Sequence, residues 1–414
     1  MSKLFLADQR EQGSCTYQDL IEDLNSGPHE LSRFFLPQNT YDAFRAYLLV
    51  LLCELDITLL DADFSKEEVE VLVPNADERA CKLSCRVDPP IRNEADLLTR
   101  IRLVGGGRIG FFTSGTTGLP KRVSHQMSTL SRSVKYSAKH SKSVWAFAFN
   151  PTHIAGCQVF MQAVLNGNSL VNVFGLDRSG IYHELEKHCV SHISATPTFY
   201  RMLMPAEQSI ASVKRVTFGG ERMDPNLVEH LKKAFPAARF LNVYASTEAG
   251  AILAAEGEVF SIKEGLEDLV RIDSDELMVH RSLLGKFGGS PRAQADDWYG
   301  TGDVVAIVST SPLRFKILHR SNELINVGGY KVNPAEVEAV LLSIAGVAEV
   351  RVFAKKNSVL GNLVCCDLVL NDSSLTEKAV KQYLNANLQS FKIPRIINFV
   401  EEIEITRTGK LKRS

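Results

Sequence analysis

Helical and extended patterns of apolar residues alternate along most of the chain. Leu20, Ile21 and Leu24 in "TYQDLIEDLN" lie on one face of a helix, and "YDAFRAYLLVLLCEL" is apolar enough to predict a mostly buried helix. "DITLLDAD" then predicts a strand that runs into a turn. Helix followed by strand recurs at "GIYHELEKHC" with "HISATP", and at "NLVEHLKKAF" with "RFLNVYA". This alternation favours an α/β fold with largely parallel strands.

A smaller α+β unit is predicted for the last part of the chain. Asn333 can cap a helix, Pro334 suits its first turn, and Glu336 completes an arrangement like a capping box. Strand patterns follow at "GVAEVRVFAKK", "LVCCDLVL" and "RIINFVEEI", together with the amphipathic helix pattern "TEKAVKQYLNANL". The sequence therefore predicts two domains, 1–321 and 322–414, with the boundary at Ser321–Asn322.

Composition then narrows the class of protein. The 414 residues are 45% hydrophobic and 23% charged, which is typical of a globular protein. A net charge of −1 gives no general attraction to nucleic acid or anionic membrane, so a small-molecule or protein partner is expected. The beginning of the chain turns polar too early for a signal peptide, and its apolar run "AYLLVLLC" is too short to span a bilayer. The eight Cys form no zinc-binding pattern, so we expect reduced thiols in a cytoplasmic protein.

The stretch "FFTSGTTGLPKRVSH" combines hydroxyl side chains, glycines and one lysine after a short apolar run. It is not a Walker loop, because Lys121 follows Pro120 and the Gly-Lys-Ser/Thr spacing is absent. Hydroxyls and glycine amides nevertheless suit phosphate oxygens, and a lysine offsets their charge. The stretch by itself therefore predicts a phosphate-binding loop, with an ordinary polar turn as the alternative.

A second candidate site is "NVYASTEAG", at the end of a predicted strand, where α/β folds bind ligands. Tyr244 could stack on a base, Thr247 could bond a phosphate, and Glu248 could hold Mg²⁺. The alternative is an exposed turn. Asp303 in "YGTGDVV" could bind a ribose diol, and Lys410 in "TRTGKLKRS" either serves the site or belongs to a solvated end.

"TSGTTGLPK", "YASTEAG", "TGD", "HRSNELINVGGYKVNPAEVE" and "TGKLKR" occur in this order, and together they resemble the adenylate-forming superfamily. Its members are acyl- and aryl-CoA synthetases, adenylation domains of nonribosomal peptide synthetases, and beetle luciferases. The resemblance covers nearly the whole chain and is weakest before the phosphate loop. It implies a large N-terminal α/β domain of packed, mainly parallel sheets with a reduced first subdomain, and a small, mobile α+β C-terminal domain that carries the catalytic lysine.

The resemblance also implies a reaction. A member of this family uses ATP and Mg²⁺ to convert a carboxylic acid into an acyl-AMP with release of pyrophosphate, and a thiol then captures the acyl group. The acceptor is expected to be CoA, so the protein would be an acid–thiol ligase of the acyl-CoA synthetase type. One alternative acceptor is the phosphopantetheine arm of an acyl or peptidyl carrier protein. A different class of function is a non-catalytic nucleotide-binding scaffold.

The resemblance assigns nucleotide-binding roles to residues of the motifs. The β- and γ-phosphates would contact Thr113, Ser114, Gly115, Thr116, Thr117 and Lys121. The adenine slot would be formed by Gly219, Gly220, Glu221, Asn242 and Tyr244. The ribose hydroxyls would contact Asp303 and Arg320.

It assigns catalytic and acyl-site roles in the same way. The catalytic residues would be Lys410 near the carboxylate, Thr247 at the α-phosphate and Glu248 as the Mg²⁺ ligand. The hinge would be Asn322, and the thiol tunnel would pass Gly328 and Gly329. The acyl pocket would be walled by His153, Ala249 and Gly250.

Some positions depart from the family pattern. His319 stands where Gly usually precedes the arginine, and Asn326 stands where many CoA ligases have Lys, which bears on the thioester step. Arg122 replaces a usual Gly and either points to solvent or adds a second cation near the phosphates. The stretch "FAFNPTHIAGC" holds Asn150 and His153 but no acid to pair with an ammonium group, so the expected substrate is an acid without an α-amine.

Overall fold

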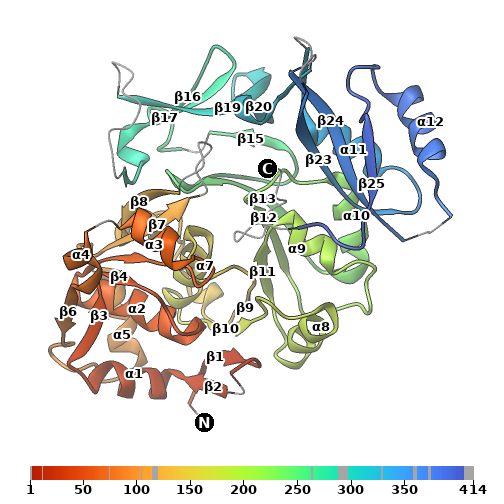
Figure 1. Cartoon of the computed structure of the whole chain (residues 1–414). Helices are drawn as coiled ribbons and strands as arrows, with labels where there is room; N and C mark the ends of the chain where they lie inside the picture. Colours follow the sequence, from red (N-terminus) through yellow and green to blue (C-terminus); the bar gives the residue numbers. More distant parts are fainter. Residues whose placement is uncertain are drawn as a thin grey trace. The chain divides into compact units, whose positions relative to one another are not determined.

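The chain, seen in a computed structural model, divides into two compact units, each with its own sheets and apolar core (Figure 1). Unit 1 comprises residues 1–257 and 280–297, and unit 2 comprises residues 258–279 and 298–414. The structure describes residues 2–11, 13–73, 75–103, 105–113, 120–262, 264–287, 297–327, 330–357, 361–371 and 374–404.

The larger sheet of unit 1 has the strand order β14-β13-β12-β11-β9-β10-β1-β2. The strands from β13 to β1 are parallel to their neighbours, and β14 and β2 are antiparallel edge strands. The bounds are β1 Leu4–Asp8, β2 Gly13–Thr16, β9 Val144–Phe147, β10 Ser169–Asn172, β11 His192–Ala195, β12 Arg215–Gly219, β13 Arg239–Ser246 and β14 Gly250–Ala255.

A second sheet of unit 1 has the order β18-β8-β7-β5-β4. Its strands β4, β5 and β7 are parallel, whereas β8 is antiparallel to both β7 and β18. A short antiparallel pair, β3 with β6, lies apart from this sheet. The bounds are β3 His29–Ser32, β4 Phe34–Phe35, β5 Asp56–Leu59, β6 Lys82–Cys85, β7 Arg108–Thr113, β8 Lys121–Gln126 and β18 Lys286–Phe287.

The helices of unit 1 begin where side chains cap them. Thr16 and Asp19 form a capping box at the start of α1, and Asn39 caps α2, which ends before Glu54 in a left-handed conformation (φ 54°). The bounds are α1 Tyr17–Asn25, α2 Thr40–Cys53, α3 Lys66–Leu72, α4 Ala76–Ala80, α5 Glu94–Leu103, α6 Met127–Ser131, α7 Ile154–Val164, α8 Arg178–Lys187, α9 Pro197–Met202 and α10 Pro225–Ala234, with a 3₁₀ turn η1 at Ala138–His140.

Aromatic packing anchors α2 and α7 against the larger sheet. The ring of Phe44 on α2 lies 4.8 Å from that of Phe147 on β9 and 4.7 Å from that of Phe160 on α7. All four residues of β10 are buried, as expected for a parallel strand covered on both faces. The predicted helix–strand alternation is therefore confirmed, including the buried helix in "YDAFRAYLLVLLCEL" and the strand in "DITLLDAD".

Unit 2 contains two sheets, with the orders β15-β20-β19-β17-β16 and β22-β21-β24-β23, and β25 pairs with β24. Two helices, α11 and α12, share an apolar core with the second of these sheets. The bounds are β15 Val259–Ser261, β16 Val270–Asp273, β17 Glu276–His280, β19 Trp298–Thr310, β20 Leu313–Arg320, η3 Ser321–Glu323, β21 Ile325–Val327, β22 Tyr330–Val332, α11 Pro334–Leu342, β23 Val347–Asn357, β24 Gly361–Leu370, α12 Glu377–Asn387 and β25 Ile396–Phe399. The 3₁₀ turn η2, Arg281–Leu283, belongs to unit 1.

The strands and helix predicted for the C-terminal α+β unit are confirmed. Asn333 caps α11 by accepting from the backbone N–H of Ala335, as predicted. The predicted role of Glu336 is wrong, because its carboxylate pairs with Lys392 Nζ at 2.6 Å. The domain boundary at Ser321–Asn322 lies inside unit 2 and stays a prediction.

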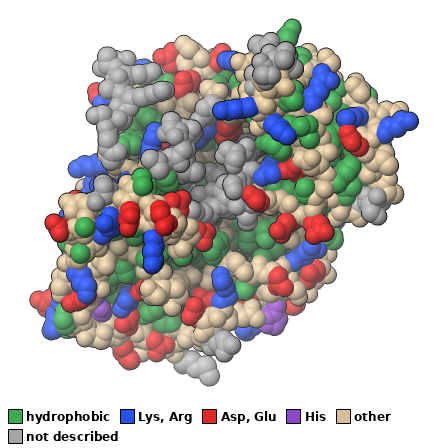
Figure 2. Space-filling model, viewed as in Figure 1, with side chains coloured by type: hydrophobic (Ala, Val, Ile, Leu, Met, Phe, Trp, Pro, Cys, Tyr) green, Lys and Arg blue, Asp and Glu red, His purple; other side chains and the backbone are tan. Residues whose placement is uncertain are grey.

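The remaining features agree with the composition. All eight Cys are free thiols. Basic and acidic side chains are interspersed on the face drawn in Figure 2. Within the ranges that the structure describes, no helix combines the length and the apolar character needed to cross a membrane.

Two buried histidines of unit 1 make stability depend on pH. Burial, aided by the charges of Arg132 and Arg108, lowers the pKa of His125 to about 4. Burial and the charge of Arg215 lower the pKa of His192 to about 4 as well. A histidine in the unfolded chain titrates near pH 6.5, so the unfolded state binds more protons between pH 4 and 6.5. Stability should therefore rise with pH across that window.

We predict that the melting temperature of the full chain falls as the pH is lowered from 7 to 4.5, and that His192→Gln reduces this fall. The reason is that a glutamine takes up no proton on unfolding, which removes a contribution on the order of 3 kcal/mol across the window. Calorimetric melting of both proteins at several pH values measures the two slopes. Equal slopes would contradict a neutral, buried His192.

Candidate functional site

The phosphate loop connects the two strands of a hairpin. Thr113, the last residue of β7, lies opposite Lys121, the first residue of β8. The structure therefore brings together the first and last of the residues expected to hold the β- and γ-phosphates. The others, Ser114, Gly115, Thr116 and Thr117, lie outside the described residues.

The residues expected to bind adenine meet at the carboxyl ends of two neighbouring parallel strands. Phe218 on β12 lies opposite Asn242 on β13, and Gly219 lies opposite Val243. Gly220, with φ 81°, turns the chain directly after β12. No described atom lies within 4 Å of where a Cβ on Gly219 would stand, so the strand end has room beside it. This is the position where α/β sheets bind ligands.

Side chains of this slot also hold the surrounding backbone. The carboxylate of Glu221 accepts from the backbone N–H of Thr198 at 3.0 Å and from its hydroxyl at 2.8 Å, which ties the loop after β12 to α9. Asn242 donates to the carbonyl oxygen of Gly257 at 3.2 Å, and Tyr244 is 8% exposed. These hydrogen bonds hold the backbone around the expected adenine slot in place.

A hydrogen bond links the phosphate-loop hairpin to the second motif. His125, on the same strand as Lys121 and 1% exposed, lies with its Nε2 2.7 Å from the carbonyl oxygen of Thr247. A carbonyl oxygen only accepts, so Nε2 carries the proton and donates it. The hydrogen bond therefore joins strand β8, which begins with Lys121, to the turn that contains Thr247 and Glu248.

The next two carbonyls of that turn also have donors. The backbone N–H of Gly285 donates to the carbonyl oxygen of Glu248 at 2.8 Å. Arg132 donates to the carbonyl oxygen of Ala249 and, at 3.0 Å, to that of Leu283. The backbone of the turn is therefore held by hydrogen bonds from two other segments of unit 1.

The side chains of Thr247 and Glu248 are half-buried, and within the described part of the chain no hydrogen bond or ion pair engages either of them. One uncommitted carboxylate suits Mg²⁺, which prefers few protein ligands together with phosphate oxygens and water. The described ranges contain no group of three or more His, Cys, Asp or Glu able to hold a metal ion. Glu248 therefore fits a metal held jointly with the phosphates of a nucleotide.

The structure places an acid beside His153 that the sequence did not reveal. Asp61, in the turn after β5, is 6% exposed, and its Oδ2 lies 3.0 Å from Asn150 Nδ2, 3.1 Å from Thr152 Oγ1 and 3.1 Å from His153 Nε2. Burial opposes ionisation of Asp61, but hydrogen bonds from His153 and the backbone of Asp63 outweigh it and lower the pKa. In the sequence, this contact was indicated by a predicted strand, "DITLLDAD", that runs directly into an acidic turn.

The three residues expected to wall the acyl pocket lie on elements that pack together. His153 precedes α7, and Gly250 begins β14 directly after Ala249. A Cβ on Gly250 would stand 2.9 Å from Gln158 Nε2 of α7, and its φ of 66° favours glycine. The structure thus brings His153 and the 249–250 turn to the same helix.

In unit 2, the residues expected to bind ribose form an ion pair. Arg320 on β20 lies opposite Asp303 on β19, and its Nε donates to Asp303 Oδ1 at 2.8 Å. Asp303 is 4% exposed, so the arginine compensates a buried charge. The hinge candidate Asn322 follows in η3, whereas Gly328, Gly329 and Lys410 lie outside the described residues.

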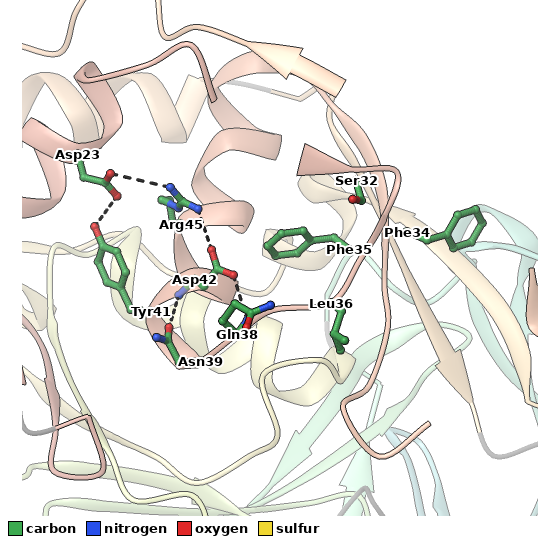
Figure 3. A pocket seen from close by; sticks show the side chains of 10 residues that line it. All are labelled: Asp23, Ser32, Phe34, Phe35, Leu36, Gln38, Asn39, Tyr41, Asp42 and Arg45. Atoms are coloured by element: carbon green, nitrogen blue, oxygen red, sulfur yellow. Dashed lines mark hydrogen bonds and ion pairs between the residues drawn. The ribbon is translucent and has the colours of Figure 1, made fainter. Parts of the chain in front are cut away.

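The departure at Arg122 has a structural explanation. Its guanidinium lies 5.7 Å from the ring centroid of Phe34, in a cation–π contact. Phe34 also lines an open recess of unit 1, whose other lining residues are Asp23, Ser32, Phe35, Leu36, Gln38, Asn39, Tyr41, Asp42 and Arg45 (Figure 3).

The polar groups of this recess pair with one another. Arg45 lies 2.8 Å from Asp42 and 3.9 Å from Asp23, and the Tyr41 hydroxyl donates to Asp23 at 2.7 Å. None of the motif residues lines the recess. It is therefore separate from the candidate nucleotide site.

Two protein-family models match parts of this chain. A model of the AMP-binding enzyme family matches residues 109–270, and a model of the AMP-binding enzyme C-terminal domain matches residues 336–410. Human mitochondrial acyl-coenzyme A synthetase ACSM1 is 28% identical over 73% of this chain, and 2-succinylbenzoate–CoA ligase of Listeria innocua is 27% identical over 73%. The chain spans 59% and 68% of the lengths of these relatives.

A solved structure shows the same fold. It is o-succinylbenzoate coenzyme A synthetase (MenE) from Bacillus subtilis in complex with ATP and a magnesium ion. The superposition has a TM-score of 0.71 and covers 99% of this chain and 95% of the other at 20% identity. The predicted fold class, a large N-terminal α/β domain with a smaller C-terminal domain, is confirmed. The chain belongs to the adenylate-forming superfamily of AMP-binding enzymes.

Proposed function

We propose that this protein is an ATP-dependent acid–thiol ligase, which activates a carboxylic acid as acyl-AMP and transfers the acyl group to CoA. The observation that carries the proposal is the hydrogen bond from His125 to the carbonyl oxygen of Thr247. It ties the strand that begins with Lys121 to the turn that presents Thr247 and Glu248, so groups suited to successive phosphates are connected within unit 1. The named activities of the relatives, acyl-CoA synthetase and CoA ligase, support this reaction type.

Adenylation joins two anions, and the proposed roles follow from that difficulty. A carboxylate oxygen of the acid attacks the α-phosphorus, and the bond to the bridging oxygen breaks to release pyrophosphate. Lys121 and the loop hydroxyls hold the leaving phosphates, and Thr247 donates to an oxygen of the α-phosphate. Glu248 would hold Mg²⁺, which neutralises charge on the phosphates when bound. Lys410 approaches the attacking carboxylate and adds a positive charge there.

The nucleoside would be held by two groups of residues. The adenine would bind at the strand ends, Gly219–Glu221 and Asn242–Tyr244. The open space beside Gly219 supports this assignment. Asp303, oriented by Arg320, accepts from the ribose hydroxyls. An ionised carboxylate is the acceptor that a diol requires.

In the second step the thiol sulfur attacks the acyl carbonyl carbon, and AMP leaves with the bridging oxygen. Domain rotation about Asn322 would remove Lys410 and admit the thiol past Gly328 and Gly329. The acceptor is CoA in this proposal, with a carrier-protein phosphopantetheine arm as the alternative. A non-catalytic scaffold would not need these charged side chains, whereas Lys121, Glu248, Asp303, Arg320 and Lys410 are all present here.

The substrate class follows from Asp61. Its carboxylate already accepts from Asn150, Thr152 and His153, so it has little capacity left for a substrate ammonium group. We therefore propose an acid without an α-amine, bound against His153, Ala249 and Gly250.

We predict acid-dependent release of pyrophosphate when the protein is given ATP, Mg²⁺ and a panel of carboxylic acids. The same panel with CoA should give a thioester and AMP, because the activated acyl group is then captured. Coupled pyrophosphate detection and mass spectrometry measure the two steps. Thioester formation only with a carrier protein would favour the alternative acceptor, and no pyrophosphate release with any of the acids would favour the scaffold.

We predict that Lys410→Ala lowers the rate of adenylation by about two to three orders of magnitude, the range for losing one well-placed electrostatic group. Thioester formation from supplied acyl-AMP should change much less, because that step does not need the lysine. Single-turnover kinetics separate the steps. A near-wild-type adenylation rate would remove the assignment of Lys410.

We predict that Asp61→Asn raises the KM for the acid by roughly ten- to hundredfold with little change in the KM for ATP, because His153 loses a charge-assisted hydrogen bond. Asp42→Asn, which disturbs a comparable ion pair with Arg45 in the recess of Figure 3, is the matched control and should leave both values near wild type. Steady-state kinetics measure the KM for the acid and the KM for ATP in each variant. Equal effects of the two substitutions would contradict a specific role for Asp61.

A further inference from the structure

Three successive carbonyl oxygens of unit 1, those of Thr247, Glu248 and Ala249, each accept a hydrogen bond from another segment. Strand β8 supplies His125, and the residue following α6 supplies Arg132. If the ends of β13 and β14 alone determined the shape of this turn, its carbonyl oxygens would not need hydrogen bonds from other segments. The arrangement is therefore a support built for this one backbone segment.

The third donor segment is fixed to the same strand. Gly285 precedes β18, whose Lys286 lies opposite Ser124 of β8. A Cβ on Gly285 would stand 2.7 Å from Nε2 of His125, so only glycine lets this backbone pass the imidazole. Arg132 also donates to the carbonyl oxygen of Leu283, which fixes the approach of that segment.

The chemistry of the turn explains why its carbonyls are held. A carbonyl oxygen carries a partial negative charge and would repel the oxygens of a phosphate. Hydrogen bonds that bind all three oxygens to protein donors keep them from turning toward a nucleotide.

We propose that His125 and Arg132 are positioning residues, which hold the 247–249 backbone so that Thr247 and Glu248 face the α-phosphate and its metal. The inference rests on the proposed function. Neither side chain touches the substrate, and both act through the carbonyls that they bind. Their loss should lower the rate of adenylation and weaken the effect of Mg²⁺, with little change in the affinity for the nucleotide alone.

The test uses the full chain with His125→Leu and Arg132→Met, which remove the donors and keep apolar bulk. His125→Gln keeps an amide donor near the position of Nε2 and should restore much of the rate. Matched controls are His192→Leu, a buried neutral histidine on β11, and Arg100→Met, a guanidinium on α5 that donates to the carbonyls of Pro89 and Pro90.

We predict that each test variant lowers kcat for acid-dependent pyrophosphate release by roughly ten- to hundredfold, the factor that corresponds to one lost hydrogen bond, with KM values little changed. The controls should keep kcat near wild type. In a Thr247→Ala background the further loss from His125→Leu should be smaller, because the part of it that acts through the Thr247 hydroxyl is already gone. A fully additive loss, or an equal loss in the controls, would overturn the inference.

A binding measurement gives a second readout. Calorimetry with a non-hydrolysable ATP analogue, with and without Mg²⁺, should show that wild type binds more tightly with the metal. The test variants should lose this enhancement and keep the metal-free affinity. Variants that keep the full enhancement would overturn the inference while the proposed function stands. Absence of acid-dependent pyrophosphate release from wild type would instead overturn the proposed function, and this inference with it.

Discussion

The hydrogen bond from His125 to the carbonyl oxygen of Thr247 is the constraint on which the candidate nucleotide site of unit 1 depends. Phosphate groups along a triphosphate are a fixed distance apart, so the groups that bind them must be fixed as well. Strand β8 meets this need because it begins with Lys121 and reaches the turn at Thr247 through His125. The hydrogen bond thus joins β8 of one sheet to the turn between β13 and β14 of the other sheet.

Two buried carboxylates of the candidate sites are compensated by hydrogen-bond donors. Asp61 accepts from Asn150, Thr152 and His153, and Asp303 accepts from Arg320. A buried ionised group is costly without such partners. Glu248 differs from both, because its carboxylate has no such partner within the described ranges, which suits the metal-binding role proposed for it.

The sequence predicted local features well and long-range contacts poorly. Apolar periodicity and capping residues gave the α/β order, the parallel strands and the C-terminal unit, because these depend on neighbours along the chain. The contact between Asp61 and His153 spans 92 positions, that between His125 and Thr247 spans 122, and that between Arg132 and Ala249 spans 117. Such pairs form because the order of the strands in the sheets brings distant segments together. That order cannot be read from a single sequence. The role predicted for Glu336 was wrong for the same reason, since Lys392 comes from a distant segment.

The central claim is that the acid attacks the α-phosphorus and leaves one of its oxygens on AMP. Supplying a substrate acid labelled with ¹⁸O in both carboxylate oxygens, together with ATP, Mg²⁺ and CoA, tests this most directly. Mass spectrometry of the products should find one ¹⁸O in each AMP and one in the thioester carbonyl. Unlabelled AMP, or formation of ADP and labelled phosphate, would contradict the account.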